Sequence, residues 1–136
     1  MQTQIQNETQ LAEWVREQFQ KANKHLAEKG VLFDSVVTEE SRYLAPFVAI
    51  WKLKDRQGKY YWVISGDVPT DFILAENAKD ARGALKHFSL HWQLTAENIQ
   101  TTNGLAEQDK AFASVLVKAA ENLYQMVEDD AIWQTA

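Results

Sequence analysis

The sequence predicts an α+β fold, in which a small antiparallel sheet of two to four strands packs with N-terminal, central and C-terminal helices. Apolar residues recur every three or four positions in three long segments, which is the period of one helix face. They alternate instead at about residues 47–65, which is typical of strands and predicts a central hairpin. Because the strands form one run and do not alternate with helices, the pattern favours α+β over α/β.

The first helix is expected from about Glu8 to Lys29. Asn7 is placed to cap its start, with Gln10 three positions later as in a capping box. Gly30 follows the last turn and suits the left-handed conformation that often ends a helix. The predicted buried stripe has helical spacing and comprises Leu11, Trp14, Val15, Phe19, Ala22 and Leu26.

The strand region is rich in aromatic residues. One short strand is expected within Val31–Leu44, and two alternating strands are expected at Phe47–Lys54 and Tyr60–Ser65. Asp55–Gly58 joins these two as a four-residue turn, in which Gly58 can supply a positive φ. One side of the first alternating strand carries Phe47, Ala49, Trp51 and Leu53, and the other side carries Val48, Ile50, Lys52 and Lys54.

Two further helices follow the strands. A central helix is expected at about Ala78–Leu94, with Asn77 as its cap and Asp80 three residues later. Residues 95–98 either extend this helix or begin a new one. The last helix is expected at about Leu105–Asp130. The two apolar stripes comprise Ala81, Leu85, Phe88 and Trp92 in the central helix, and Leu105, Phe112, Leu116, Ala119, Leu123 and Val127 in the last.

Length and composition indicate a single domain over residues 1–136, because 46% hydrophobic and 24% charged residues are ordinary for a globular protein. The net charge of −5 argues against nucleic acid and anionic membranes as partners. The lack of cysteine excludes disulfides, thiol nucleophiles and thiolate metal sites. No segment approaches the roughly 20 apolar residues of a membrane helix, and the first residues do not form a secretory signal, so we expect a cytoplasmic protein.

Two aspartates after the predicted hairpin are the first candidates for a binding site. Asp67 and Asp71 are four residues apart in a loop that Pro69 stiffens. Loops at the ends of sheets often carry function. The structural alternative is that Asp67 forms a turn and that Asp71 caps a short helical turn at Phe72–Leu74. We favour this alternative, because aspartate, proline and glycine are the residues that a turn uses.

The central helix carries the other candidates. Arg82 lies near its start, where a cation opposes the helix dipole, so either a carboxylate partner or an anionic ligand is expected; Arg42 has the same ambiguity. His87 and His91 are four residues apart and can hold zinc only with a third ligand, for which Asp80 is a candidate. Because no specific third ligand is evident, we expect a solvated or hydrogen-bonded histidine pair, and no metal or cofactor.

Aromatic side chains can stack on bases or sugars, but packing within the sheet and core is the better explanation here. The residues concerned are Trp51, Tyr60, Tyr61, Trp62 and Trp92. The sequence has no nucleophile–base motif, no phosphate-binding glycine loop and no dinucleotide fingerprint. Catalysis by dispersed residues stays open, so the pattern does not decide whether the chain is an enzyme.

Three parts of the sequence together carry a resemblance. They are Ser41–Trp51, Ile64–Asp71, and the helix residues Arg82, His87, Phe88 and Trp92. These stretches resemble a family of short bacterial proteins of unknown function, known from marine-type gammaproteobacteria. The resemblance covers most of the chain and implies no activity, cofactor or catalytic residue. It implies that the aspartate loop and the Arg82–His87 segment are the first places to look for a site.

Two functional hypotheses follow from the sequence. The leading one is a non-catalytic interaction or accessory domain, which binds a protein partner or a second copy of itself. It rests on the small size of the chain, on the lack of a recognisable catalytic set, and on an apolar tail, Ile132-Trp133, that follows the amphipathic C-terminal helix. The alternative is a small-ligand site, enzymatic or not, where the hairpin end meets the central helix. Its lining residues would be Asp67, Asp71, Arg82 and His87.

Overall fold

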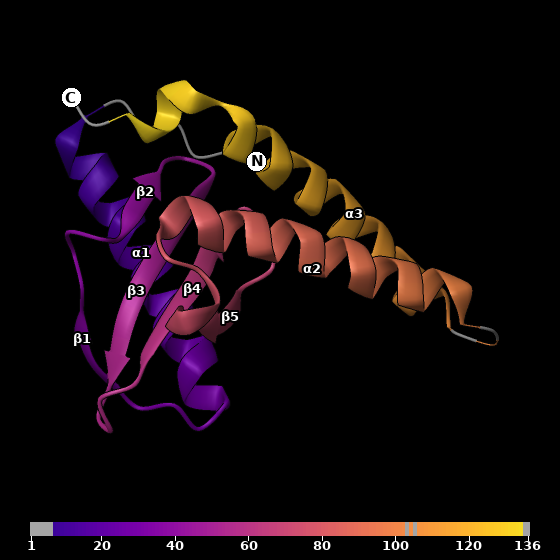
Figure 1. Ribbon diagram of the computed structural model, residues 1–136, viewed down its shortest axis with the longest axis horizontal. Helices are drawn as coiled ribbons and strands as arrows, with labels where there is room; N and C mark the ends of the chain where they lie inside the picture. Colours follow the sequence, from indigo (N-terminus) through magenta and orange to yellow (C-terminus); the bar gives the residue numbers. More distant parts are fainter. Residues whose placement is uncertain (1–6, 103, 105, 135–136) are drawn as a thin grey trace. The chain divides into compact units, whose positions relative to one another are not determined.

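The computed structural model describes residues 7–102, 104 and 106–134, and it confirms the α+β class (Figure 1). Within these residues the long helices are α1 (Glu8–Glu28), α2 (Ala81–Thr101) and α3 (Glu107–Glu128). The strands are β1 (Phe33–Val36), β2 (Arg42–Leu44), β3 (Val48–Asp55), β4 (Tyr60–Gly66) and β5 (Asp71–Leu74). Two short 3-10 helices complete the secondary structure, η1 (Ala75–Asn77) and η2 (Asp130–Trp133).

Backbone contacts divide the chain into two compact units, Met1–Ala84 and Leu85–Ala136, and the boundary falls inside α2. The first unit contains α1 and the sheet. The second contains most of α2, together with α3 and η2. In the part of the chain that the structure describes, no helix combines the length and the apolar character needed to cross a membrane.

Helix α1 confirms the predicted boundaries and both predicted end signals. The Asn7 Oδ1 accepts a hydrogen bond from the Gln10 backbone N–H at 2.9 Å. At the other end Gly30 adopts a φ of +81°, and its N–H donates to the Ala27 carbonyl at 3.0 Å. Because both caps satisfy backbone groups that the helix leaves unpaired, the local sequence alone is enough to define this element.

The hairpin of β3 and β4 forms the centre of the antiparallel sheet, as predicted. Its register places Val48 opposite Gly66 and Lys54 opposite Tyr60. Gly58 has a φ of +85° in the connecting turn, which a residue with a side chain rarely adopts. The described strands follow the order β1-β3-β4-β5, and β2 pairs with β3 beside β1. The sheet therefore has five strands, one more than the predicted maximum.

The region predicted as one strand, residues 31–44, contains two, β1 and β2, and both pair with β3. Ser41 explains how they share one edge. Its Oγ donates to the Val37 carbonyl at 2.9 Å and accepts from the Lys52 N–H at 2.9 Å. The side chain thus fills the gap in the β3 ladder between the two short strands.

The helical turn predicted at residues 72–74 is wrong, because these residues form strand β5. This strand pairs with β4 from Asp71 opposite Ile64 to Leu74 opposite Tyr61. Phe72 packs against the core between α1 and the sheet. The edge of β4 supplies backbone partners that the local sequence does not reveal, and this explains the error.

One face of the sheet packs against α1, and Ala49, Trp51 and Leu53 lie on it as predicted. Phe47 does not, because it precedes β3 and is 46% exposed. The buried residues of this core are Trp14, Ala22, Leu26, Ala49, Trp51, Leu53, Tyr61 and Val63. A polar chain crosses the core: the Trp51 indole N–H donates to the Ser65 Oγ at 3.1 Å, and Ser65 donates to the Gln18 carbonyl at 3.0 Å. Satisfied buried hydrogen bonds of this kind fix the position of the helix on the sheet.

The other face of the sheet carries Val48, Ile50, Trp62 and Ile64, which are also buried. The Trp62 indole N–H donates to the Ala78 carbonyl at 2.9 Å, which holds the segment before α2 against this face. Of the aromatic residues singled out from the sequence, Tyr60 alone is exposed. Core and sheet packing therefore accounts for the others, as predicted.

Helix α2 begins later and ends later than predicted. Asp80, and not Asn77, lies at its start, because the Asp80 Oδ1 accepts from the Gly83 N–H at 2.8 Å. The helix continues without a break through the segment 95–98 to Thr101. Its predicted stripe is confirmed, since Ala81, Leu85, Phe88 and Trp92 are all buried.

Helices α2 and α3 run antiparallel within the second unit (Figure 1). The buried Ser89 Oγ of α2 donates to the Ala120 carbonyl of α3 at 2.8 Å. Four residues of the predicted α3 stripe are buried, namely Leu116, Ala119, Leu123 and Val127. Phe112 is 48% exposed, contrary to the prediction. Leu105 lies outside the described residues.

Candidate functional site

The aspartate loop is positioned by Gly66, which ends β4 with a φ of +130°. A Cβ on Gly66 would overlap the Phe47 carbonyl oxygen and would lie 2.7 Å from the Val48 Cα. The next residue, Asp67, donates its N–H to the same Phe47 carbonyl at 2.7 Å, and its side chain is exposed. The close approach of the two backbone segments thus requires glycine before Asp67, and it fixes the position of the Asp67 backbone.

Asp71 has a different environment, because it is half-buried and is the first residue of β5. Its Oδ1 accepts from the Phe72 N–H at 2.8 Å. Arg82 is half-buried in the first turn of α2. These residues and Asp67 belong to the first unit, whereas His87 belongs to the second. The convergence of the four side chains on one pocket stays a prediction.

His87 and His91 lie on one face of α2, with their rings stacked 6.2 Å apart and inclined by 12°. The His87 ring also meets the edge of Phe88 at 6.3 Å. Among the described residues, no group of three His, Cys, Asp or Glu side chains is arranged to hold a metal ion. The pair is therefore an aromatic contact on the helix surface in this structure.

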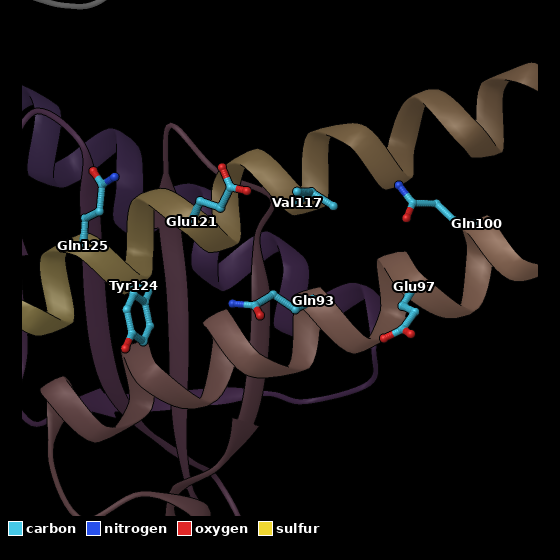
Figure 2. Close-up of a pocket in the computed structure, with 7 residues that line it drawn as sticks. All are labelled: Gln93, Glu97, Gln100, Val117, Glu121, Tyr124 and Gln125. Carbon is cyan, nitrogen blue, oxygen red and sulfur yellow. The ribbon is translucent and has the colours of Figure 1, made fainter.

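A groove within the second unit was not predicted. It lies between α2 and α3 and has a volume of about 610 Å³, in the range typical of ligand sites (Figure 2). Its lining residues are Gln93, Glu97, Gln100, Val117, Glu121, Tyr124 and Gln125. Figure 2 shows the Tyr124 ring reaching from α3 toward α2. One carboxylate comes from each helix, so the groove has acidic groups on both sides.

The groove has a signal in the sequence, although it is weak. Gln93, Glu97 and Gln100 recur at steps of four and three, and so do Val117, Glu121 and Tyr124. Each set therefore occupies one helix face. The α2 stripe is polar and the α3 stripe is mixed, and such stripes are usually solvated. Only the antiparallel pairing of α2 with α3 turns the two separate stripes into one concave surface.

A smaller cavity of about 150 Å³ adjoins the β3–β4 turn in the first unit, and Asp55 and Tyr61 are among its lining residues. The Asp55 carboxylate is already engaged by three donors. Its Oδ1 accepts from the Gln57 and Lys59 N–H groups at 2.8 and 2.9 Å, and its Oδ2 accepts from the Tyr61 hydroxyl at 3.0 Å. Asp55 therefore stabilises the turn, and these three hydrogen bonds account for its burial without a ligand.

Comparison with known proteins places the chain in a family. Residues 8–133, from the start of α1 to the end of η2, match the model of a domain of unknown function, DUF4826. The chain belongs to this family. The DUF4826 match confirms the resemblance to a family of unknown function, and it covers both units. No curated protein and no solved structure matches the chain.

Proposed function

We propose that the chain is a non-catalytic interaction domain that binds a protein partner through its α2–α3 hairpin. The observation that carries this proposal is the groove of about 610 Å³ between the two helices. Large apolar side chains accompany it: Leu90 is 48% exposed, Leu94 is 62% exposed and Tyr124 is 47% exposed. Apolar side chains that gather on a surface beside polar ones are typical of interaction sites.

The C-terminal segment takes a smaller part in this proposal than the sequence suggested. The Trp133 indole N–H donates to the Met126 carbonyl at 2.9 Å, so the tail is held against the last turn of α3. Ile132 and Trp133 are both half-buried. The partner surface is therefore assigned to the hairpin and not to a projecting tail, and a second copy of the chain is the alternative partner.

The proposal includes a bacterial cytoplasmic setting and a single domain over residues 1–136. The resemblance of Ser41–Trp51 and Ile64–Asp71 to short bacterial proteins supports the first part. The lack of cysteine agrees with a reducing compartment. The net charge of −5 supports a protein partner over nucleic acid or an anionic membrane.

A site-specific photocrosslinker tests the interaction surface. A benzophenone amino acid replaces Tyr124 in the groove or, as a control of similar exposure, Tyr60 in the first unit, 42% exposed. We expect a discrete adduct in cells of the source organism from position 124 and not from position 60. Equal adducts at both positions, or no adduct at 124, would contradict the proposal.

The part of the predicted small-ligand site that lies in the first unit, with Asp67, Asp71 and Arg82, is the second candidate function. The fixed backbone at Gly66, which positions Asp67, is the observation in its favour. A thermal-shift screen against metabolites and divalent metals serves as the second arm of the experiment, because a ligand that binds the folded state raises its melting temperature. A stabilising ligand whose effect is lost in Arg82→Ala would favour this candidate over the interaction domain.

A further inference from the structure

The second unit holds most of the net negative charge of the chain. Residues 85–136 contain three lysines and no arginine against seven aspartates and glutamates, which is a formal charge of −4 out of −5 for the whole chain. Glu97 and Glu121 line the groove, and no lysine is among its described lining residues. The field within the groove is therefore negative, and it favours a cationic occupant.

The groove also has an apolar component at helical spacing. Val117 and Tyr124 line it from α3 and are seven residues apart, which places them on one face. On α2, Leu90 and Leu94 each precede a groove residue by three positions, so they flank it on the neighbouring stripe. Both leucines are exposed. The surface thus combines apolar contact area with carboxylates.

The shape of this surface fits a helix. Two antiparallel helices present a long depression into which a third helix packs at about 8–10 Å between axes, as in helical bundles. From Leu90 to Gln100 the surface extends over eleven residues of α2, or roughly 15 Å, which corresponds to about three turns of an occupant. Recognition of an amphipathic helix in a groove uses anchors at this spacing.

We infer that the α2–α3 groove binds a basic amphipathic helix of a partner protein. This inference rests on the proposed function and specifies the partner. The aliphatic stems of lysine or arginine would pack on Val117 and Tyr124, while their cationic groups would reach Glu97 and Glu121. An arginine would also stack on the Tyr124 ring.

The charge distribution argues against a second copy of the chain as the occupant. Pairing of two hairpins through this face would bring together two units of −4 each. Like charges placed across an interface oppose association. The value of −4 already includes the three lysines of the unit.

The test is an NMR titration of the ¹⁵N-labelled full chain with two synthetic helices of about 14 residues. Both carry leucine at steps of three and four; one has lysine at the flanking positions and the other has glutamate. We expect the lysine peptide to shift the amide signals of α2 and α3 groove residues with a Kd of about 10–100 µM, and the glutamate peptide to bind at least about tenfold more weakly.

Two double variants with the same change in charge separate the groove from a general electrostatic attraction. Glu97→Gln with Glu121→Gln is expected to weaken the lysine peptide about fivefold, whereas Glu107→Gln with Glu128→Gln weakens it by less than about twofold. Exposed substitutions of this type leave folding intact, which circular dichroism verifies. Equal weakening by both variants, or equal binding of both peptides, overturns the inference.

The remaining outcomes distinguish this inference from the proposed function. A crosslinked adduct at position 124 together with no preference for the lysine peptide overturns the inference and leaves the interaction domain standing.

Sedimentation of the free chain is the third arm of the test. A dimer that dissociates in Val117→Glu assigns the groove to a second copy and overturns the basic partner. If neither adduct nor peptide binding is observed, both proposals fail.

Discussion

At the scale of single residues, Asp55 shows how one carboxylate stabilises a turn. Burial favours its neutral form, but hydrogen bonds from the Lys59 N–H, the Tyr61 hydroxyl and the Gln57 N–H favour the carboxylate, so that the net pKa of Asp55 is lowered. Burial and the bond to Asp55 raise the pKa of Tyr61, which keeps its hydroxyl protonated as a donor. The pair therefore stays in the hydrogen-bonding form at neutral pH.

The lowered pKa of Asp55 predicts a dependence of stability on acid. The folded state holds the Asp55 proton less tightly than the unfolded state does. The contribution of ionised Asp55 to stability is therefore complete above the ordinary pKa of 3.8 and is lost as pH falls through the folded pKa. We expect the free energy of unfolding to decrease between about pH 5 and pH 2, with a shallower slope in Asp55→Asn. Urea unfolding across this range measures it.

The exposed Asp34→Asn variant is the matched control for this measurement. It removes the same chemical group from a strand edge, so a shallower slope in Asp55→Asn than in Asp34→Asn assigns the effect to the turn. An Asp55→Asn variant with the same slope as Asp34→Asn would show that the turn carboxylate does not titrate with folding.

At the scale of elements, α2 begins three residues later than its sequence predicts. Both Asn77 and Asp80 are good N-caps, and both are followed by helix-forming residues. Residues 75–77 instead form η1, and the Trp62 indole N–H binds the Ala78 carbonyl at 2.9 Å. This long-range hydrogen bond holds residue 78 in an extended conformation, so the helix begins only after the next good cap.

The two caps differ in their expected effect on stability. Asp80→Ala is expected to lower the free energy of unfolding by about 1 kcal/mol, because the Gly83 N–H loses its acceptor. Asn77→Ala is expected to change it by less than about 0.5 kcal/mol, as for an ordinary surface position. Chemical denaturation of both variants gives the comparison. A larger loss for Asn77→Ala than for Asp80→Ala would contradict the observed helix start.

At the scale of the whole molecule, the two units share one helix. Residues Ala81–Ala84 of α2 belong to the first unit and the rest of α2 to the second. The helical hydrogen-bond ladder is continuous across the boundary, so melting of either unit would fray the helix that anchors the other. This continuity favours the prediction that residues 1–136 unfold as one domain.

Calorimetry tests this prediction directly. We expect a single thermal transition whose calorimetric enthalpy equals its van't Hoff enthalpy, which is the signature of two-state unfolding. Tryptophan fluorescence and far-ultraviolet circular dichroism should report the same midpoint. Two resolved transitions, or different midpoints by the two probes, would mean that the units unfold separately.

Local patterns in the sequence determined much of the fold. The boundaries of α1, the β3–β4 hairpin with its Gly58 turn, and the buried stripes of α2 and α3 all depend on periodicity, caps and turn residues within a few positions of one another. The resemblance to a family of unknown function rests separately on Ser41–Trp51, Ile64–Asp71 and the α2 residues from Arg82 to Trp92, and the DUF4826 match confirms it.

Only the tertiary structure decided features that depend on distant partners. Strand β5 exists because the β4 edge is available to it, and Ser41 allows β1 and β2 to share one edge because Lys52 lies opposite. The groove exists because α3 returns beside α2, so that the polar stripe of α2 faces the stripe of α3 that carries Val117, Glu121 and Tyr124. Sequence periodicity reports which face of an element a residue occupies, but not which other element that face will meet.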